Sequence, residues 1–444
     1  MITVKNKDKI LDHGNRELRA KALEILEKSI NSVFPENLIK KYVTVDNNII
    51  KIGKNMIKIS GKILVIGAGK ATYHMAYAIE QLLGNRIDKG LIIVPYGNYE
   101  KFSKIEIFQA AHPILDNNTL KGTEHILRLI KNLSADDLVI CLISGGASSL
   151  LELLPDRIAL SDIQQLNSLL LDCGADIMDF NIVRKHLSLV KGGKLATNIF
   201  PANCVSLILS DVPNNDPALI GSGPTVFDNS TPSDAYNILK KYDLIDKISP
   251  SITSFLKKST VERSSDLKVT NILIGTNYLA CKTALQTARK MGFRPLLLST
   301  YFEGESRFVG AMTANIANEC KQKNLPLKPP CALIIGGETT VTIGNAKGIG
   351  GRNQEFVLSA LLKLKESQNI VVTSVGTDGI DGNSKYAGSI ADWGTLDNAT
   401  KIGLEPTKFL LVHDSSSFFE QLNDAIYTGT TGTNVGDLRF FLIA

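Results

Sequence analysis

Two basic side chains follow glycine turns where helices are expected to begin. Lys70 comes directly after Gly67-Ala68-Gly69, and Arg352 comes directly after Gly350-Gly351. Glycine lets a backbone approach a ligand closely, and the start of a helix attracts anions. The planar guanidinium of an arginine also matches phosphate and carboxylate groups. Both stretches therefore predict contact with an anion, with a solvated helix lysine as the alternative for Lys70.

Neither of the two familiar nucleotide motifs is complete around Lys70. A P-loop requires a glycine where this chain has Leu64, and a serine or threonine where it has Ala71. A dinucleotide fingerprint requires a third small residue where Thr72 stands. It also requires an acid near the end of the second strand, where this chain has Pro95-Tyr96-Gly97. The sequence therefore disfavours a nicotinamide cofactor.

Glycine, hydroxyl and basic residues form two further clusters in the first half of the chain. The first follows an apolar strand and consists of Ser144, Gly145, Gly146, Ser148 and Ser149. It predicts a cradle for phosphate or carboxylate, with a hydroxyl-rich helix cap as the alternative. The second contains Arg184 and Lys194, which either bind an anion or only complement a helix dipole.

Carboxylates suited to magnesium or to a substrate hydroxyl also follow expected strands. Asp211 comes directly after an apolar strand, and Asp378 and Asp381 lie in a glycine-rich turn. Hard cations take oxygen ligands, so Asp378 and Asp381 are predicted to hold a metal. Glu338 and Asn353, in two other glycine-rich stretches, are predicted to contact substrate. Turn chemistry explains each cluster singly, but their number favours a ligand site.

The elements that position these residues alternate between apolar strands and helices. Such strands indicate a parallel sheet covered on both faces, whose carboxyl ends share one edge. The pattern restarts after a polar, serine-rich segment at 249–266. We therefore predict an α/β protein with two domains, 1–255 and 256–444. The segment 214–233 is predicted to be a long functional loop.

Composition excludes several classes of protein. The 444 residues carry 49 basic and 44 acidic side chains, a net charge of +5 that gives no argument for nucleic acid. No apolar run reaches the length of a membrane helix, and the polar N-terminus does not resemble a signal peptide. The six cysteines are scattered, which predicts free thiols in a reducing compartment. We expect a cytoplasmic protein.

Taken together, these motifs resemble the MOFRL-type glycerate 2-kinases. The resemblance covers most of the chain and rests on stretches that occur in the family's order: 67–71, 144–150, 184–196, 210–225, 336–343, 350–356, 376–382 and 430–437. Ala147 departs from the family, which often has a glycine there.

The resemblance implies a Rossmann-like N-terminal domain and a smaller mixed α/β C-terminal domain, with the active site in the cleft between them. It implies transfer of the γ-phosphoryl group of ATP to the 2-hydroxyl of D-glycerate with Mg²⁺. It further implies that Lys70 and Arg352 carry the reacting charge. The partners are then glycerate and a nucleotide, and a homo-oligomer is left open.

Two other functions remain as alternatives. A hydroxypyruvate reductase is one, because members of this family have carried that name, but it needs the nicotinamide site that the sequence disfavours. A non-catalytic anion-binding protein on the same scaffold is the other, and it would not need Lys70, Arg352 and several carboxylates together.

Overall fold

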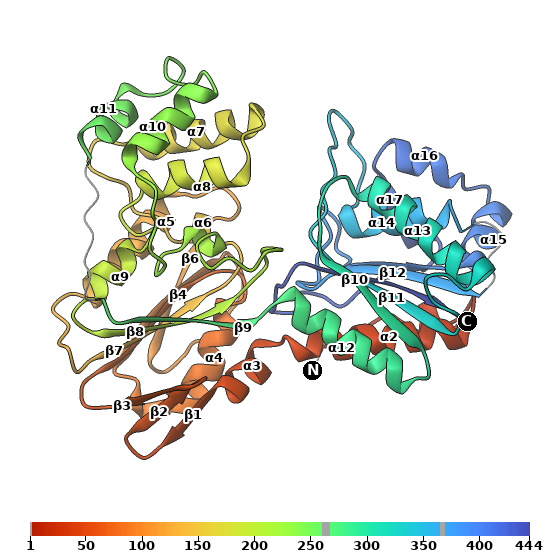
Figure 1. The fold of residues 1–444 in the computed structure, drawn as a ribbon, viewed down its shortest axis with the longest axis horizontal. Helices are drawn as coiled ribbons and strands as arrows, with labels where there is room; N and C mark the ends of the chain where they lie inside the picture. Colours follow the sequence, from red (N-terminus) through yellow and green to blue (C-terminus); the bar gives the residue numbers. More distant parts are fainter. Residues whose placement is uncertain (1, 260–266, 365–368) are drawn as a thin grey trace. The chain divides into compact units, whose positions relative to one another are not determined.

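The computed structural model describes residues 2–259, 267–364 and 369–444 and divides into two compact units (Figure 1). The N-terminal unit contains Leu38–Ser210 and Asn215–Ile274. The C-terminal unit contains Met1–Asn37, Asp211–Asn214 and Gly275–Ala444. Each unit has its own six-stranded sheet.

This division differs from the predicted ranges 1–255 and 256–444 in three respects, one of which is that Asp211–Asn214 groups with the C-terminal unit. The first 37 residues group with the second half of the chain, and the N-terminal unit extends past residue 255 to Ile274. The predicted boundary segment contains helix α11 (Pro250–Lys258), and its residues 260–266 lie outside the described residues. The polar composition of this segment predicted a domain boundary, but side-chain packing determines where the units divide.

The N-terminal unit is built on a sheet of strand order β6-β5-β4-β7-β8-β9. Strands β4 to β8 pair in parallel, as predicted. The strands are β4 (Ile63–Ala68), β5 (Lys89–Pro95), β6 (Ile105–Ala110), β7 (Leu138–Ile143), β8 (Asn203–Leu209) and β9 (Val269–Gly275). Every residue of β4 and β7 is buried, as expected for central strands with helices on both faces.

Helices cover both faces of this sheet. Figure 1 shows α4 and α5 on opposite faces. Along the chain, α3 (Pro35–Tyr42) begins in the C-terminal unit and ends in this one. The other helices of the unit are α4 (Thr72–Leu83), α5 (Asn117–Leu129), α6 (Ala147–Leu150), α7 (Leu160–Asp172), α8 (Ile177–His186), α9 (Lys194–Ile199), α10 (Pro232–Lys241) and α11, with 3₁₀ turns η1 (Gly84–Arg86) and η2 (Ile220–Ser222). The predicted loop 214–233 contains only η2 before α10 begins.

A small antiparallel sheet precedes β4 and was not anticipated from the sequence. It consists of β1 (Val43–Asp46), β2 (Ile49–Ile52) and β3 (Asn55–Lys58). Each strand has only four residues, and only the apolar positions on one face are buried. Such short segments carry too little periodicity to separate strand from loop.

The C-terminal sheet is mixed, with strand order β10-β11-β15-β12-β13-β14. Only β10 and β11 are parallel, and β15 runs antiparallel between β11 and β12. The strands are β10 (Arg294–Phe302), β11 (Cys331–Gly337), β12 (Ile370–Gly376), β13 (Gly388–Ala391), β14 (Ala425–Ile426) and β15 (Asp437–Ile443). The last strand of the chain therefore occupies the middle of this sheet.

Two cores flank the C-terminal sheet because alternate residues of each strand face opposite sides. Phe440 and Leu442 belong to the core under α2 and α12, whereas Phe441 and Ile443 belong to the core under α13 and α14. The helices of the unit are α1 (Lys7–Ile10), α2 (Arg16–Ser32), α12 (Asn277–Lys290), α13 (Ser306–Lys323), α14 (Arg352–Leu361), α15 (Trp393–Lys401), α16 (Pro406–Leu411) and α17 (Ser415–Gln421).

A buried arginine attaches α2 to the C-terminal unit. Arg19 is fully buried, with its Nε 2.8 Å from Oδ2 of Asp392 and its Nη1 2.5 Å from Oδ1 of Asp424. Burial opposes the charged form, but the two carboxylates outweigh it and raise the pKa of Arg19. This ion pair, with the apolar face of α2, explains why the N-terminal residues group with the second half.

The cysteines and the apolar segments can be compared with the structure. All six cysteines are free, and five of them are buried. Within the described residues, no helix combines the length and apolar character that crossing a membrane requires.

Candidate functional site

Lys70 lies in the turn between β4 and α4, as the sequence predicts. Its backbone N–H donates to the carbonyl of Gly145 at 2.9 Å, which joins this turn to the loop after β7. Close approach requires glycine here, because a Cβ at Gly67 would lie 2.3 Å from the Leu142 carbonyl. Neighbouring parallel strands thus bring the two glycine-rich loops together at one sheet edge.

Ser144 holds these two loops in place. It is fully buried, and its hydroxyl accepts from the backbone N–H of Ala71 at 3.0 Å and lies 3.1 Å from the Thr72 hydroxyl. A Cβ at Gly69 would lie 2.2 Å from this hydroxyl. Ser144 is therefore occupied with internal contacts, and of its cluster Gly146 and Ser148 are the partly exposed members.

A histidine that the sequence analysis did not single out lies beside Lys70. A Cβ at Gly146 would be 2.9 Å from Nε2 of His112 and 3.3 Å from Cγ of Lys70, so three loops meet at this point. Burial, and secondarily the charge of Lys70, lowers the pKa of His112 to about 4. His112 is therefore neutral at pH 7. The position of His112 just after strand β6 is the feature of the sequence that could have predicted it as a site residue.

Arg184 and Lys194 lie in a second basic cluster of the N-terminal unit. The Arg184 guanidinium lies over the Phe180 ring, 4.5 Å from its centroid, and its Nε donates to Asn167. Lys194 Nζ donates to the carbonyls of Lys185 and Ser188, at 2.7 and 2.5 Å. Burial lowers the pKa of Lys194 to about 8. Lys194 thus caps the end of α8, whereas no hydrogen bond from the Arg184 terminal nitrogens is found among the described residues.

A chain of side-chain hydrogen bonds connects this region with the serine cluster. The Ser148 and Ser222 hydroxyls are 3.1 Å apart, and Ser222 donates to Oδ1 of Asn181 at 2.9 Å. Asn181 lies one helical turn before Arg184 on α8. Glu152 forms a buried ion pair with Lys191 and also acts on the charges of Arg184 and Lys194. Asn181 and Glu152 are not among the residues predicted from the sequence.

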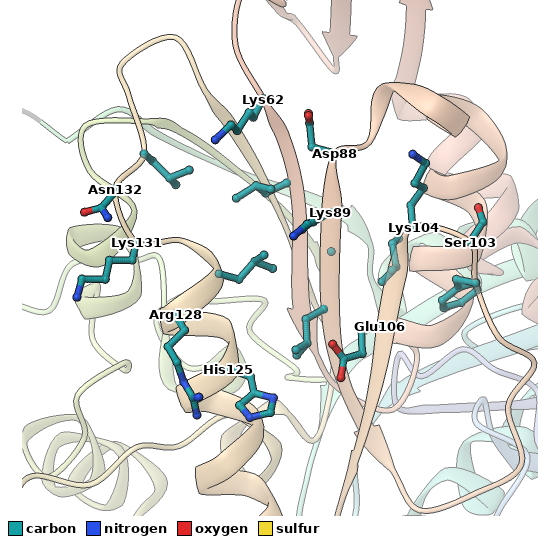
Figure 2. Close-up of a pocket in the computed structure, with 17 residues that line it drawn as sticks. Lys62, Asp88, Lys89, Ser103, Lys104, Glu106, His125, Arg128, Lys131 and Asn132 are labelled. Atoms are coloured by element: carbon teal, nitrogen blue, oxygen red, sulfur yellow. The ribbon is translucent and has the colours of Figure 1, made fainter.

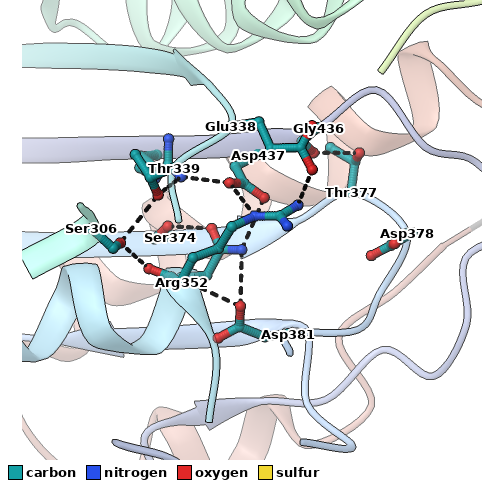
Figure 3. Close-up of polar contacts among 12 residues, drawn as sticks. Ser306, Glu338, Thr339, Arg352, Ser374, Thr377, Asp378, Asp381, Gly436 and Asp437 are labelled. Carbon is teal, nitrogen blue, oxygen red and sulfur yellow. Dashed lines mark hydrogen bonds and ion pairs between the residues drawn. The ribbon is translucent and has the colours of Figure 1, made fainter. Parts of the chain in front are cut away.

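Arg352 is the first residue of α14, and two carboxylates orient it (Figure 3). Its Nε donates to Oδ2 of Asp437 at 2.7 Å, and its Nη2 is 3.0 Å from Oε1 of Glu338. The Arg352 side chain is 30% exposed, whereas Asp437 is fully buried. Burial acts against the charge, but Asp437 and then Glu338 raise the pKa of Arg352. The two carboxylates fix the guanidinium, while part of the Arg352 side chain remains exposed.

Asp437 is the centre of this cluster, and the sequence analysis did not single it out. At the start of β15, it accepts from Arg352, from Arg439 and from Asn353 Nδ2, the last at 3.0 Å. Burial acts to raise its pKa, but Arg352 and Arg439 outweigh this and hold the pKa of Asp437 below its usual value. Asp437 is therefore an anion that positions two arginines.

Asp381 caps the start of α14. Its Oδ1 accepts from the Asn353 backbone N–H at 2.9 Å, and its Oδ2 accepts from that of Gln354 at 2.8 Å. A Cβ at Gly351 would lie 2.4 Å from Oδ1, so the close approach needs glycine. Burial raises the pKa of Asp381 to about 6. Both oxygens are therefore engaged in holding the first turn of α14, at Asn353 and Gln354, in position.

Asp378 and Asp211 lie in the same unit as Arg352. Asp378 is half-buried, and its Oδ1 accepts from the backbone N–H of Ile380 at 3.1 Å. Asp211 is also half-buried, and its Oδ2 accepts from Asn434 Nδ2 at 3.2 Å. Among the described residues, no group of three or more His, Cys, Asp and Glu side chains is arranged to hold a metal.

The predicted residues therefore form three groups. Lys70 lies with the serine cluster, Arg184 with Lys194, and Arg352 with Glu338, Asn353 and Asp381. The fold and these groups define an α/β protein whose oriented basic residues, at strand ends and helix starts, can neutralise an anionic ligand.

Comparison with known proteins identifies the family. A model for a domain of unknown function, DUF4147, matches residues 21–257, and the MOFRL family model matches residues 331–437. The chain is 39% identical to the D-glycerate 2-kinase of Thermotoga maritima, over 96% of this chain and 98% of that protein. It is 37% identical to the glycerate 2-kinase of Pyrococcus horikoshii, with the same coverage. The chain belongs to the MOFRL family of glycerate 2-kinases.

Solved structures agree with this placement. The crystal structure of a glycerate kinase from Thermotoga maritima matches with a TM-score of 0.86, 38% sequence identity, and coverage of 96% of this chain and 100% of that one. A relative from Agrobacterium vitis, 38% identical over 86% of this chain and 87% of its own length, is provisionally named hydroxypyruvate reductase. The predicted fold class and family are thus confirmed.

Proposed function

We propose that this protein transfers the γ-phosphoryl group of ATP to the 2-hydroxyl of D-glycerate, giving 2-phosphoglycerate and ADP. The observation that carries the proposal is the guanidinium of Arg352, held at a helix start by Asp437 and Glu338 and partly open to solvent. Full-length similarity to glycerate 2-kinases supports the same reaction.

In this reaction the C2 oxygen of glycerate bonds to the γ-phosphorus while the bond to the β,γ-bridging oxygen breaks. The hydroxyl proton is released, and ADP leaves. Catalysis of this kind depends mainly on positioning and on neutralising charge on the transferring group. Arg352 supplies a fixed cation, and its two carboxylate partners keep it from reorienting, so little reorganisation is needed when charge moves. Lys70 supplies the second cation.

The remaining predicted residues receive roles within the proposal. Asp211, oriented by Asn434, is proposed to accept a hydrogen bond from the glycerate hydroxyl. Gly145, Gly146 and Ser148 are proposed to contact phosphate or the glycerate carboxylate through their backbone and hydroxyl donors. Arg184 is proposed to bind the second anionic group of a substrate, because within the described part of the chain only its Nε forms a hydrogen bond.

Asp378 is the residue that we propose to bind Mg²⁺, which in kinases screens the charge of the nucleotide phosphates. Magnesium in such enzymes is held by one or two carboxylates together with phosphate oxygens. A site without a cluster of three protein ligands fits that arrangement. Because both oxygens of Asp381 accept backbone N–H groups, its proposed role is to position α14.

The deciding experiment is phosphorus NMR of the product formed from D-glycerate and Mg-ATP, beside a coupled assay for ADP. The expected product is 2-phosphoglycerate, with ADP released in equal amount. Exclusive formation of 3-phosphoglycerate, or no ADP release, contradicts the proposal. Oxidation of NADH by hydroxypyruvate, without kinase activity, would instead favour the reductase named for the Agrobacterium relative.

A further inference from the structure

The N-terminal unit contains a large groove at the sheet edge opposite the glycine-rich loops. It has a volume of about 940 Å³ and lies at the amino ends of β4, β5 and β6 beside the end of α5 (Figure 2). Lys70 and Ser144 instead follow the carboxyl ends of β4 and β7. The groove is therefore separate from the proposed phosphoryl-transfer site.

Basic side chains dominate the polar lining of the groove. The cations are Lys62, Lys89, Lys104, Arg128 and Lys131, and the carboxylates are Asp88 and Glu106. Five cations against two carboxylates give a formal charge of +3, more than half of the +5 carried by all 444 residues. The groove thus concentrates a charge that is weak over the chain as a whole.

Little in the described part of the chain neutralises these cations. None of the four lysines forms an ion pair there, although Lys62 acts on the Asp137 carboxylate and helps to lower its pKa. Arg128 has only an exposed pair with Glu124 at 3.4 Å. Asp88 is committed elsewhere, because its Oδ2 accepts from the backbone N–H of Ile63 at 2.8 Å. Exposed pairs of the Arg128 type contribute little. An anionic ligand would therefore be attracted without first displacing an internal partner.

The remaining lining of the groove is mostly apolar. Its apolar part consists of Leu64, Gly90, Leu91, Phe102, Ile105, Leu129 and Leu133, and its uncharged polar part of Ser103, His125 and Asn132. An apolar floor with a basic rim suits a molecule that combines a flat, weakly polar body with a strongly charged group. The volume lies within the range of small-ligand sites, roughly 300 to 1,000 Å³.

We propose that this groove is a second ligand site, which binds an organic phosphate: its apolar body lies on the floor and its phosphate faces the lysines. Phosphate is favoured over a single carboxylate because several cations surround one opening. A groove of limited volume also favours a small molecule over nucleic acid, which needs an extended basic surface.

The test uses the full-length protein and adenosine 5′-monophosphate as the probe. Hydrogen–deuterium exchange locates the bound probe, and titration calorimetry measures its affinity. Bound probe should slow exchange in peptides covering 103–106 and 128–133, a readout that binding at the Lys70 loop does not give. Adenosine and inorganic phosphate, tested separately, should each bind at least about tenfold more weakly than adenosine 5′-monophosphate. Adenosine lacks the phosphate that the lysines would bind, and inorganic phosphate lacks the body that would lie on the apolar floor.

The matched variants separate local charge from total charge. Lys89→Glu/Lys131→Glu should weaken the affinity at this groove by about tenfold or more and remove the protection. The control Lys54→Glu/Lys121→Glu makes the same change in net charge at exposed lysines outside the groove, and should retain binding. Melting temperature and kinase rate verify that both variants are folded.

Absence of protection at these peptides in the parent protein overturns the proposal. So does equal protection in the Lys89→Glu/Lys131→Glu variant. Binding of inorganic phosphate as tight as that of the probe overturns the role of the apolar floor. A single-stranded oligonucleotide that protects the same peptides far more tightly than the probe overturns the small-molecule assignment.

Discussion

The Asp437 carboxylate, fully buried at the start of β15, accepts a 2.7 Å hydrogen bond from the Arg352 guanidinium at the start of α14. The same oxygen also accepts from the buried Arg439. One carboxylate therefore compensates the charges of a partly exposed arginine and a buried arginine. Both the position of Arg352 and the stability of the fold thus depend on Asp437.

We predict that Asp437→Asn both destabilises the protein and lowers kcat. Arg439 would be left without its buried counter-charge, and breaking such a pair costs about 3 to 5 kcal/mol. The free energy of unfolding in denaturant measures the stability, and ADP release measures the rate. Glu338→Gln is the control, because it removes an exposed carboxylate from the same guanidinium and should cost less than about 1 kcal/mol. Equal stability losses in the two variants would contradict this account.

We predict that Lys70→Ala and Arg352→Ala each lower kcat by on the order of 10²-fold or more. A positioned cation on a transferring phosphoryl group contributes at least that much. Because both charges are proposed to serve one transition state, the two losses should not add in the double variant. Steady-state kinetics beside thermal melts provide the measurement.

Lys70→Ala should melt within a few degrees of the parent, and Arg352→Ala should still fold, because Asp437 keeps Arg439 as a partner. Lys54→Ala, at an exposed lysine in the same unit as Lys70, is the control for loss of a lysine. A Lys70→Ala enzyme with the parent kcat would reduce that residue to a solvated lysine.

Substitution of Asp378 and Asp381 should have different consequences. Asp378→Asn should raise the Mg²⁺ concentration needed for half-maximal rate by about tenfold, since it removes a charged ligand. Asp381→Asn should instead lower stability by about 1 to 3 kcal/mol, because one of the two oxygens that accept a backbone N–H is replaced by an NH₂ donor. Mg²⁺ titrations and denaturant unfolding test both. A Mg²⁺ dependence that shifts only in Asp381→Asn would reverse the assignment.

The stability of the protein should depend on pH through His112. Its pKa is lowered from an ordinary 6.5 to about 4 by burial and by Lys70, so the unfolded chain binds more protons between these values. The stability that depends on neutral His112 is therefore present above pH 6.5 and is lost as the pH falls towards 4. The free energy of unfolding, measured with urea at several pH values across this range, should change less steeply with pH in His112→Gln than in the parent. An unchanged slope would exclude this histidine as the cause.

Gly146→Ala should impair activity more than the matched change Gly174→Ala. Both glycines have positive φ, +84° and +70°, so both variants carry a strain of about 1 kcal/mol. A Cβ at Gly174 meets nothing within 4 Å, whereas one at Gly146 lies 2.9 Å from the His112 ring and 3.3 Å from Lys70. The kcat of Gly146→Ala should fall while that of Gly174→Ala stays near the parent. Similar rates in the two variants would show that this contact is unimportant.

The sequence determined the parallel N-terminal sheet and the meeting of two of its loops. β4 and β7 are continuous apolar runs that end in glycine-rich turns, and parallel neighbours present those ends at one edge. Lys70 and the cluster at Ser144 could therefore be expected together, since the signal lies within a few residues of each. Arg352 at a helix start was predictable for the same local reason.

Only the tertiary structure decided what surrounds these residues. Asp437 is 85 positions from Arg352, and it reaches the guanidinium because β15 inserts antiparallel between β11 and β12. Asp381 is a predicted metal ligand because it is a carboxylate in a glycine-rich turn, and in the structure its two oxygens accept backbone N–H groups at the start of α14. Likewise, Arg19 joins α2 to the C-terminal unit through Asp392 and Asp424. Local sequence fixes turns and helix starts, whereas ion pairs between distant segments depend on which strands lie side by side.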